Sequence, residues 1–400
     1  MSNIPKLRFP EFSGEWEEKT FGDILSLNMV PVPKPDTEYE RLGIFCHNKG
    51  TFHEHITDPS YIALDTLYKV HKNNFIVNIT FAWEHAIAIT TQNDEDTLVT
   101  FRFLMFSFNK GYYHQFFKYA FSKEKFRYDL NVASPDGAGR NRVLNQKQLN
   151  NINLIVPSIS EQEKIADFLS NVDSIITAET KILNTLQKKK KALMQKLFTQ
   201  QLRFKSNDGT DFPAWEEKKL GDVCDIIGGG TLDTNKAEYW NGNIQWFTPT
   251  EIGNTKYISE SKRKITQLGF EKSSAKLLPV GTILFTSRAT LGEMSITTVE
   301  CTTNQGFQSL IPNKNFVHPD YLYYLQPILQ KYCYSKASGS TFLEISAKSL
   351  KECHIPLPCK AEQQKITDCL SSMDSLIQIQ QKVVTTRQQR KKALLQQMFI

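Results

Sequence analysis

The sequence lacks the short motifs that mark most cofactor and metal sites. Its seven cysteines are odd in number and include no Cys-x-x-Cys pair, which argues against a disulfide framework and against a tetrahedral zinc site. It has no Walker A motif, so we expect no ATP hydrolysis by this chain. It also lacks the Pro-Pro-aromatic tetrapeptide of amino-methyltransferases and any carboxylate cluster typical of a two-metal nuclease. These absences favour a non-catalytic protein that binds no metal.

Long hydrophobic runs are missing as well. No stretch approaches the roughly 18–20 apolar residues of a membrane span, and no apolar run follows Lys6 and Arg8 to form a secretory signal. With 40% hydrophobic and 22% charged residues, we expect a cytoplasmic globular protein without a membrane partner. Its 400 residues predict two or three domains. The net charge of +6 is compatible with a phosphate-binding surface but does not require one.

The chain is a tandem repeat. LRFPEFSGEWEEKTFGDI near the start matches LRFKSNDGTDFPAWEEKKLGDV, about 200 residues further on. A longer, ungapped match aligns residues 149–199 with residues 350–400 and places EQEKIADFLSNVDSII over EQQKITDCLSSMDSLI. Two matches in the same order do not arise by chance, so an ancestral unit was duplicated.

Each repeat divides into a mixed domain and a helix. The first part has short β-type runs with Gly, Pro and Asn punctuation, such as NNFIVNITFAW and VGTILFTSRATLG. The last part lacks Gly and Pro and is typical of a long helix. We predict an α+β protein with two similar mixed α/β domains, at 1–158 and 201–359. Long helices at 159–200 and 360–400 are expected to form an antiparallel two-helix coiled coil that separates the domains, in a pseudo-two-fold tandem repeat.

Both helices carry an apolar seam that repeats every seven residues, which favours a coiled coil over an ordinary surface helix. In the first helix the seam comprises Ile165, Leu169, Val172, Ile176, Glu179, Leu183, Leu186 and Leu193. In the second it comprises Ile366, Leu370, Met373, Ile377, Val384, Lys391 and Leu394. The alternative is that each helix packs on its own domain, which would require a separate covering surface for each.

The coiled coil would act as a spacer. Duplicated units prefer a two-fold relation, so the helices would pair antiparallel with one domain near each end. A helix of this length spans about 57 Å, more than the roughly 34–36 Å between half-site centres one DNA turn apart. Polar residues in a seam fix its register. In the register that we favour, Glu179 faces Lys391. Lys190 then faces Gln380.

The helices and the segments before the domains resemble the specificity subunits of type I restriction–modification enzymes. Each helix opens on P-x-x-x-E-Q-x-K-I-x-x-x-L-x-x-x-D, from Pro157 to Asp173 and from Pro358 to Asp374, and ends in K-K-A-L-x-Q. Segments that begin at Trp16 and Trp215 and end in Gly-Asp resemble the openings of the family's target-recognition domains.

The resemblance extends through both domains and covers nearly the whole chain. In the first domain, residues 68–78 and 83–87 resemble the family's variable-domain pattern, with His85 where we expect glycine. In the second domain, LPVGTILFTSRATLG, then residues 303–305, SGSTFLEI and IPLP follow the family's order.

The resemblance implies a subunit that binds double-stranded DNA and catalyses nothing. In that family each recognition domain reads one half of an asymmetric bipartite site through the major groove. The helices set the spacer and dock two methyltransferase subunits that methylate adenine N6, and restriction–motor subunits complete the enzyme. No cofactor is expected on this chain, since S-adenosylmethionine, ATP and Mg²⁺ belong to the partner subunits.

Polar and basic loop residues are the candidate DNA contacts, because such side chains bind base edges and phosphates. In the first domain they are Asn78, Thr80, Arg140, Asn141 and Arg142. In the second domain they are Lys262, Arg263, Lys264, Thr286, Ser287, Arg288, Thr290, Ser340 and Thr341. We expect residues 262–264 to face phosphates. The alternative for each candidate is a solvated loop residue.

Three other functions stay open. Methyl transfer by the purified chain alone would indicate an enzyme, a nuclease or methyltransferase, whose catalytic residues are not recognised. No sequence-dependent DNA affinity in the presence of a methyltransferase partner would favour a partner-binding scaffold. Tight operator binding without any partner would favour a free-standing DNA-binding regulator.

Overall fold

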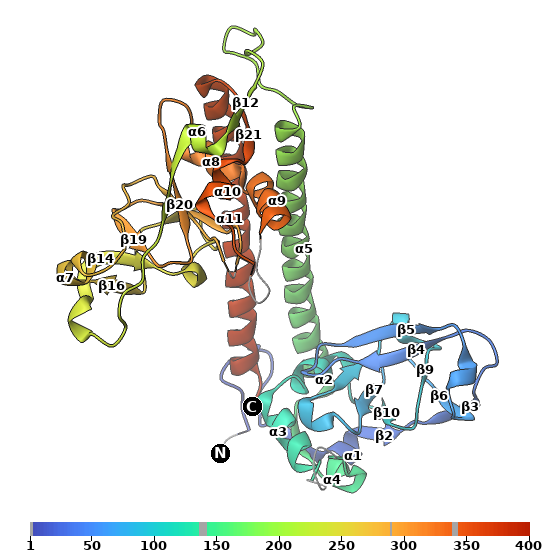
Figure 1. The fold of residues 1–400 in the computed structure, drawn as a ribbon. Helices are drawn as coiled ribbons and strands as arrows, with labels where there is room; N and C mark the ends of the chain where they lie inside the picture. Colours follow the sequence, from blue (N-terminus) through green and yellow to red (C-terminus); the bar gives the residue numbers. More distant parts are fainter. Residues whose placement is uncertain (1–2, 136–141, 289, 338–342) are drawn as a thin grey trace. The chain divides into compact units, whose positions relative to one another are not determined.

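The computed structural model describes residues 3–135, 142–288, 290–337 and 343–400 (Figure 1). The chain packs into two compact units. Unit 1 comprises residues 1–181 and 382–400, and unit 2 comprises residues 182–381. Each unit therefore holds one globular lobe, the first half of one long helix and the second half of the other. The sequence boundaries after residues 158, 200 and 359 follow the chain rather than its packing, and they stay a prediction.

The described residues of the lobe of unit 1 form three sheets. A two-stranded sheet pairs β1 (Glu17–Thr20) with β11 (Asn153–Val156). A four-stranded sheet has the order β2 (Leu25–Leu27), β10 (Phe103–Phe108), β7 (Phe75–Asn78), β8 (Ile87–Ile89). A five-stranded sheet has the order β3 (Val30–Pro33), β6 (Thr66–Lys69), β9 (Leu98–Val99), β4 (Tyr39–Ile44), β5 (Thr51–Ile56). The two-stranded sheet joins the start of the lobe to its end, directly before the first long helix.

Short helices and phenylalanine rings form the core of this lobe. The α-helices are α1 (Phe21–Ile24), α2 (His114–Ala120), α3 (Glu124–Val132) and α4 (Gln146–Asn150), and the 3-10 turns are η1 (Pro59–Tyr61), η2 (Ala82–Glu84) and η3 (Gln92–Asp94). Phe21, Phe75, Phe121 and Phe126 are buried, and the rings of Phe121 and Phe126 stack with centroids 4.3 Å apart. Aromatic side chains remove large apolar areas from water, so this cluster stabilises the lobe.

His85 occupies the position where the family resemblance leads to glycine. Its φ is 63°, in the left-handed region that glycine adopts without steric cost. The side chain is buried and its Nε2 lies 2.8 Å from the Phe121 carbonyl oxygen. Burial lowers the pKa of His85, so the imidazole is neutral and Nε2 donates to that carbonyl. The hydrogen bond stabilises a backbone conformation that a non-glycine residue rarely adopts.

The lobe of unit 2 has a related plan with different sheets. Its two-stranded sheet pairs β12 (Glu216–Lys219) with β21 (His354–Leu357). A five-stranded sheet has the order β13 (Cys224–Gly228), β20 (Gln308–Pro312), β17 (Ile283–Phe285), β18 (Met294–Thr297), β15 (Tyr257–Ile258). A three-stranded sheet has the order β16 (Arg263–Ile265), β14 (Trp240–Phe247), β19 (Cys301–Thr303). The two-stranded sheet again stands directly before a long helix.

The helices of this lobe are also short. They are α6 (Leu220–Val223), α7 (Gln267–Glu271), α8 (Pro319–Tyr324), α9 (Gln326–Lys336) and α10 (Ala347–Lys351), with 3-10 turns η4 (Ala237–Tyr239) and η5 (Pro249–Glu251). Tyr321, Tyr324 and Phe285 are fully buried in the core. Among the residues that the structure describes, no helix is both long and apolar enough to cross a bilayer.

The two long helices predicted from the sequence are present as α5 (Ile159–Phe198) and α11 (Lys360–Met398) (Figure 1). Every seam residue named from the sequence is buried or half-buried. Apolar residues off the seam, such as Ile182 and Ile379, are exposed. The seven-residue pattern therefore marks the buried face of each helix, as a coiled coil requires.

The first turns of each helix serve two packing partners. In unit 1, Ile165 and Leu169 of α5 share the hydrophobic core of the lobe with Met398 of α11. In unit 2, Leu370 of α11 and Leu197 of α5 share the core of the other lobe. The alternative that each helix packs on its own lobe thus holds for its first turns, while the same turns also meet the end of the opposite helix.

Ion pairs fix the register of the helices in unit 1. Lys391 Nζ lies 2.5 Å from Asp173 Oδ1, and an Arg387 guanidinium nitrogen lies 3.1 Å from Glu179 Oε1. The residue numbers rise along one helix as they fall along the other, so the helices are antiparallel. The predicted contact between Glu179 and Lys391 is wrong by more than one helical turn.

The register of unit 2 requires the same correction. Lys190 Nζ forms its ion pair with Asp374 Oδ1. The predicted partner, Gln380, lies six residues further along α11 than Asp374, which is more than one helical turn. Lys190 binds Asp374 because an ion pair with a hydrogen bond outweighs an amide partner such as Gln380.

Candidate functional site

A buried glutamate anchors the lobe of unit 1 to its long helix. Glu161, in the first turn of α5, is 1% exposed. Arg8 donates from Nε to Glu161 Oε1 at 2.7 Å and from a terminal nitrogen to Oε2 at 2.8 Å. Trp16 Nε1 donates to the same carboxylate at 3.3 Å. The bidentate arginine and the indole satisfy a charge that would be costly to bury alone.

Unit 2 contains the same anchor. Glu362 of α11 is fully buried, and Arg203 donates to its two oxygens at 3.1 and 2.7 Å. Trp215 Nε1 donates to Oε2 at 2.8 Å. The glutamate of the helix-opening motif and the tryptophan of the preceding segment therefore have one shared purpose, which is to fix a lobe against the start of a helix.

The glutamine after each glutamate fixes a second segment of the lobe. Gln162 Nε2 donates to the carbonyl of the motif proline at 2.9 Å, and its Oε1 accepts from Tyr113 N at 2.9 Å. Gln363 makes the corresponding bonds, at 2.9 Å to its proline and 2.9 Å from His318 N. Both glutamines are buried. Gln162 therefore holds the start of α2 against α5, and Gln363 holds the start of α8 against α11.

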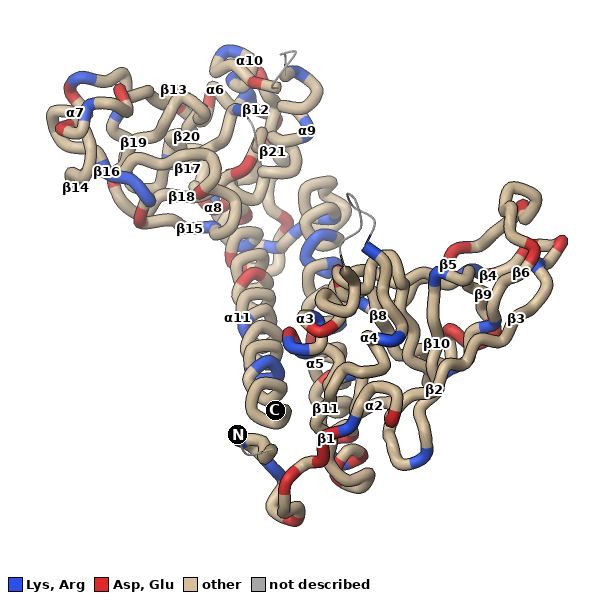
Figure 2. Tube along the Cα trace, turned by 90° about the horizontal axis from the view of Figure 1, so that it is seen from below, with Lys and Arg blue, Asp and Glu red and all other residues tan. Residues whose placement is uncertain are grey.

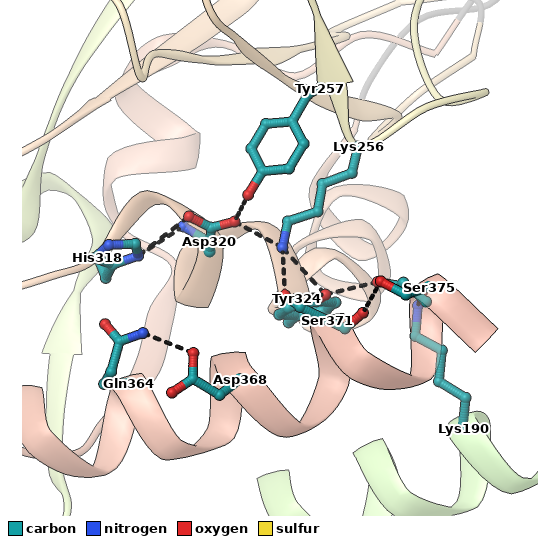
Figure 3. Close-up of polar contacts among 11 residues, drawn as sticks. Lys190, Lys256, Tyr257, His318, Asp320, Tyr324, Gln364, Asp368, Ser371 and Ser375 are labelled. Carbon is teal, nitrogen blue, oxygen red and sulfur yellow. Dashed lines mark hydrogen bonds and ion pairs between the residues drawn. The ribbon is translucent and has the colours of Figure 1, made fainter. Parts of the chain in front are cut away.

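A lysine, an aspartate and a tyrosine meet where each lobe contacts the two helices. In unit 2 the ion pair of Lys190 and Asp374 is joined by Tyr324, which donates from its hydroxyl to Asp374 Oδ2 at 2.6 Å. Tyr324 Oη lies 3.1 Å from Ser371 Oγ, and Lys190 Nζ lies 5.3 Å from the Tyr324 ring centroid. Figure 3 shows Tyr324 beside Ser371 on α11, with Lys190 reaching toward α11 from the opposite helix.

Unit 1 repeats this cluster. Tyr119 donates from its hydroxyl to Asp173 Oδ2 at 2.9 Å and lies 3.3 Å from Ser170 Oγ, and Lys391 Nζ stands 5.4 Å from the tyrosine ring centroid. Burial raises the pKa of Tyr119 and of Tyr324, so both hydroxyls stay protonated and donate at any physiological pH. Each cluster ties one lobe to both helices of its unit.

Unit 2 adds a buried lysine to its cluster (Figure 3). Lys256 Nζ lies 2.6 Å from Asp320 Oδ1, donates to Ser371 Oγ at 2.9 Å and to Tyr324 Oη at 3.1 Å. Tyr257 also donates to Asp320. Burial by itself would raise the pKa of Asp320, but the hydrogen bonds from Lys256 and Tyr257, together with the positive charge of Lys256, outweigh it and lower the pKa below its ordinary value. Asp320 is therefore ionised and balances the buried ammonium group.

A large apolar cleft opens beside this cluster in unit 2. Its volume is about 930 Å³, and its apolar lining comprises Met194, Phe198, Ile328, Tyr332 and Ile377. Lys191 and Lys331 line it as well, and no acidic residue in the described part of the chain forms an ion pair with either. Unit 1 has a cleft of about 120 Å³ beside α3 and the end of α11.

The candidate DNA contacts of the first lobe gather around one tryptophan. Asn78 ends β7, and its Oδ1 accepts from Thr80 N at 3.0 Å. Trp83 Nε1 donates to the Thr80 carbonyl at 3.1 Å, and the Arg142 guanidinium lies 5.2 Å from the Trp83 ring centroid. The structure therefore brings Asn78, Thr80 and Arg142 together. Arg140 and Asn141 lie outside the described residues.

The candidates of the second lobe form two groups. Lys262, Arg263 and Lys264 follow one another at β16, and the Arg263 guanidinium carbon lies 3.4 Å from the Trp240 ring centroid. In Figure 2 the tube is blue at β16. Lys264 Nζ lies 3.2 Å from Glu260. Arg263 is thus the member of the group that an aromatic ring holds in place.

The second group stands after β17, and half of it is buried. Thr286 and Ser287 are fully buried, and Thr286 donates to the Thr290 carbonyl. Arg288 forms an ion pair with Glu344 at 2.9 Å. Burial does not favour a direct DNA contact for Thr286 and Ser287, whereas Thr290 is exposed. Ser340 and Thr341 lie outside the described residues.

Sequence reasoning missed the tryptophans and the buried lysine. The guanidinium groups of the candidates Arg142 and Arg263 lie near the rings of Trp83 and Trp240, respectively. Lys256 joins a lobe to α11. The signal that could have found Trp240 is an aromatic residue in the same short-strand region as the basic run at 262–264, and no such signal marks Trp83, which lies far from Arg142 in the sequence. No sequence pattern pointed to Lys256, because its partners lie on α8 and α11, both far from it in the sequence.

Comparison with known proteins gives a consistent result. The family described as "Type I restriction modification DNA specificity domain" matches residues 13–188 and 214–385. The specificity subunit of the type I restriction enzyme MjaIX of Methanocaldococcus jannaschii is 41% identical over 190 residues, which cover 46% of this chain and 44% of that protein. The match therefore spans less than half the length of this relative.

Two solved structures share the fold. One is a chain from a study of complex assembly and conformational transition in a type I restriction–modification system, with a TM-score of 0.61 and 18% identity over 96% of this chain and 97% of that chain. The other is the S subunit of a type I restriction–modification system from M. genitalium, with a TM-score of 0.58 and 15% identity over 99% of both chains. At these identities the likeness concerns the fold alone.

Proposed function

This chain belongs to the type I restriction modification DNA specificity family, and from that premise we propose that it is the sequence-specific DNA-binding subunit of a type I restriction–modification complex. In this role it reads DNA and carries no catalytic group. Each lobe would recognise one half of an asymmetric bipartite site, and the paired helices would set the length of the unspecified spacer between the halves.

One observation carries the proposal: anchors of the same kind hold two different lobes. The Glu161 and Glu362 anchors each join one arginine and one tryptophan to a buried carboxylate, while the lobes have sheets of four and five strands in unit 1 and of five and three strands in unit 2. If the two lobes recognised one and the same ligand, we would expect their sheets to be alike. A bipartite, asymmetric DNA site requires two unlike surfaces on one repeated support.

The DNA contacts that we propose are the exposed and half-buried candidates of each lobe. In unit 1 these are Asn78, Thr80 and Arg142. In unit 2 these are Lys262, Arg263, Lys264, Arg288 and Thr290. Base edges and phosphates are bound by these residue types. Four further candidates are kept in the proposal on the basis of the sequence alone: Arg140, Asn141, Ser340 and Thr341. Thr286 and Ser287 are kept because they shape their loop.

The partners that we propose are two methyltransferase subunits, joined by restriction–motor subunits for cleavage. S-adenosylmethionine, ATP and Mg²⁺ would be bound by those partners. The apolar cleft of unit 2 supports docking, because a cleft with an apolar lining and free lysines suits an amphipathic helix with acidic flanks.

The proposal is tested by mapping methylated adenines in a host that expresses this chain with its partner methyltransferase. We expect two unlike half-sites separated by a spacer of fixed length. When the lobe of unit 2 is exchanged for that of a relative, one half-site should change and the other should persist. An undivided motif, or a change in both halves, would contradict the proposal.

The rival functions predict other outcomes of the same work. The purified chain alone should transfer no methyl group from labelled S-adenosylmethionine to DNA, and transfer would make it an enzyme. Lack of sequence-dependent affinity in the complex with the methyltransferase would favour a scaffold. Tight binding of one genomic operator by the chain alone would favour a regulator.

A further inference from the structure

Arg263 lies flat on an aromatic platform at the edge of the lobe of unit 2. Its guanidinium carbon is 3.4 Å from the Trp240 ring centroid, the distance of a stacked contact, and 5.7 Å from that of Trp246. The two indoles meet edge to face, with centroids 5.1 Å apart. Resting on the proposed DNA-reading function, we propose that Arg263 recognises the N7 and O6 atoms of one guanine in the half-site read by unit 2.

A β-bulge builds this platform. In the pairing of β14 with β16, both Trp240 and Ile244 align with Ile265, so β14 carries extra residues between them. Asn241 has a φ of 62°, and a Cβ on Gly242 would lie 2.4 Å from the Ile265 carbonyl oxygen. Bulges redirect side chains. The bulge in β14 turns Trp240 back along the strand, so that its ring lies under Arg263. Arg263 stands two residues before Ile265 in the sequence.

The platform and the arginine backbone are both held in place. Trp240 Nε1 donates to the Asp233 carbonyl at 3.3 Å, and Trp246 Nε1 donates to the Gly230 carbonyl at 3.4 Å. Ser261 Oγ lies 2.6 Å from the Arg263 carbonyl oxygen and accepts from Trp246 N at 3.0 Å. The stack is thus fixed at its rings and at its strand, and little side-chain freedom is left to lose on binding.

The donors of Arg263 face no partner in the described part of the chain. The Arg288 guanidinium is engaged by Glu344, and the Lys264 ammonium group by Glu260. No described carboxylate forms an ion pair with Arg263, and no described acceptor takes a hydrogen bond from its guanidinium. Stacking on Trp240 occupies only the face of the guanidinium, so its in-plane nitrogen–hydrogen bonds stay available and Arg263 stays exposed.

Guanine is the ligand that matches these donors. A guanidinium donates two parallel hydrogen bonds in its own plane, and guanine presents N7 and O6 side by side in the major groove. A phosphate also accepts paired hydrogen bonds from a guanidinium, but it can do so in many orientations, so a fixed guanidinium plane matters more for a base edge than for a phosphate. The fixed plane therefore favours base recognition over the phosphate contact expected from the run of three basic residues.

The experiment uses the complex of the full chain with its methyltransferase, on the site obtained by methylation mapping. Each guanine in the half-site of unit 2 is replaced in turn by 7-deazaguanine and by the other bases. We expect one guanine at which base replacement weakens wild-type binding by about 5-fold to 150-fold, the range of a good bidentate contact. At that position 7-deazaguanine should also weaken wild-type binding.

The variants R263A and R263K separate the possible contacts. R263A should bind all base pairs at that position with one affinity and should be unaffected by 7-deazaguanine there. R263K keeps the charge and the folded lobe but not the planar pair of donors fixed on the ring, so it should discriminate the bases less well than the wild type. Lys262→Ala serves as a phosphate comparator, with an equal loss on every sequence, and Lys272→Ala removes an exposed charge of the same lobe as a control for net charge.

Three outcomes would overturn the proposal. If R263A weakens binding equally on all sequences and lowers the salt dependence by about one ion, then Arg263 contacts a phosphate. If R263K and R263A discriminate bases as the wild type does, then Arg263 makes no base contact. If the half-site read by unit 2 contains no G·C pair, then the proposed guanine contact is excluded. In each case the wild-type complex still binds a specific site, whereas loss of specificity in the wild type itself would refute the proposed function.

Discussion

Unit 1 and unit 2 hold their lobes with the same three types of side chain, but the phenylalanine at the end of the opposite helix packs differently in the two units. In unit 1 the Phe399 ring stacks on Phe116 at 5.2 Å and meets Trp16 at 6.3 Å. In unit 2 the corresponding Phe198 meets Tyr321 edge to face at 6.0 Å and lines the large cleft. The anchor is thus repeated, and the packing around it is not.

The difference shows which contacts the duplicated design requires. The Glu–Arg–Trp anchor and the Lys–Asp–Tyr cluster occur in both units, so both belong to the shared support. The cleft and Lys256 occur in unit 2 and have no counterpart of that size or kind among the contacts described for unit 1. These asymmetric features can be removed in one unit while the other serves as an internal reference.

The largest effect is expected from the anchors. Glu362→Ala should lower the free energy of unfolding by about 3–5 kcal/mol, because Arg203 and Trp215 lose the buried carboxylate that they bind. Glu161→Ala should cost a similar amount through unit 1. Denaturant unfolding measures both. Glu216→Ala, at a side chain that is 66% exposed, should change stability by less than about 0.5 kcal/mol. A small loss at one anchor alone would break the equivalence of the units.

The next effect concerns the lysine that unit 2 adds. Lys256→Met should cost about 3 kcal/mol at neutral pH, because it leaves Asp320 buried without its ammonium partner. In the wild type the pKa of Asp320 lies below 3.8, so its stabilising ionised form is present above that pH and is lost as the pH falls through the lowered pKa. In the variant, burial raises that pKa.

The pH dependence therefore has a definite sign. The difference in unfolding free energy between the wild type and Lys256→Met should shrink as the pH falls from 7 to 3, because protonated Asp320 no longer needs the lysine. Lys218→Met, at a half-exposed ion pair, is the matched control and should show no such trend. A constant difference across this range would show that Lys256 acts through packing alone.

The support could be predicted from the sequence, and its register could not. The duplication and the seven-residue seam depend on periodicity, which can be read from a single sequence. Several offsets of the two helices would give nearly equivalent seams. The observed register is the one in which Asp173 and Asp374, which flank the seam, form ion pairs with lysines of the opposite helix. Likewise, the sequence placed Thr286 among the polar loop residues but did not give the direction of its side chain, and the stack of Arg263 depends on a bulge that no pattern predicted.

A smaller effect is expected at the cleft. Ile328→Asp places a charge in its apolar lining and should weaken docking of one methyltransferase subunit by about 2 kcal/mol. Native mass spectrometry should then show complexes with one methyltransferase where the wild type has two. Lys125→Ala on α3 of unit 1, which removes an exposed i,i+4 ion pair, is the control and should leave the stoichiometry unchanged. Loss of both methyltransferases, or of neither, would refute docking at this cleft.

The smallest effect tests the helix register within unit 1. Arg387 and Glu179 lie 3.1 Å apart but are 41% and 20% exposed, so water and salt screen their attraction. A double-mutant cycle with Glu179→Gln and Arg387→Gln should give a coupling of about 0.5 kcal/mol at low salt. The cycle of Glu179→Gln with Lys391→Gln should give a coupling near zero, because Lys391 binds Asp173. If the second coupling exceeded the first, the register inferred from the seam would be right and the observed ion pairs would not describe the helices in solution.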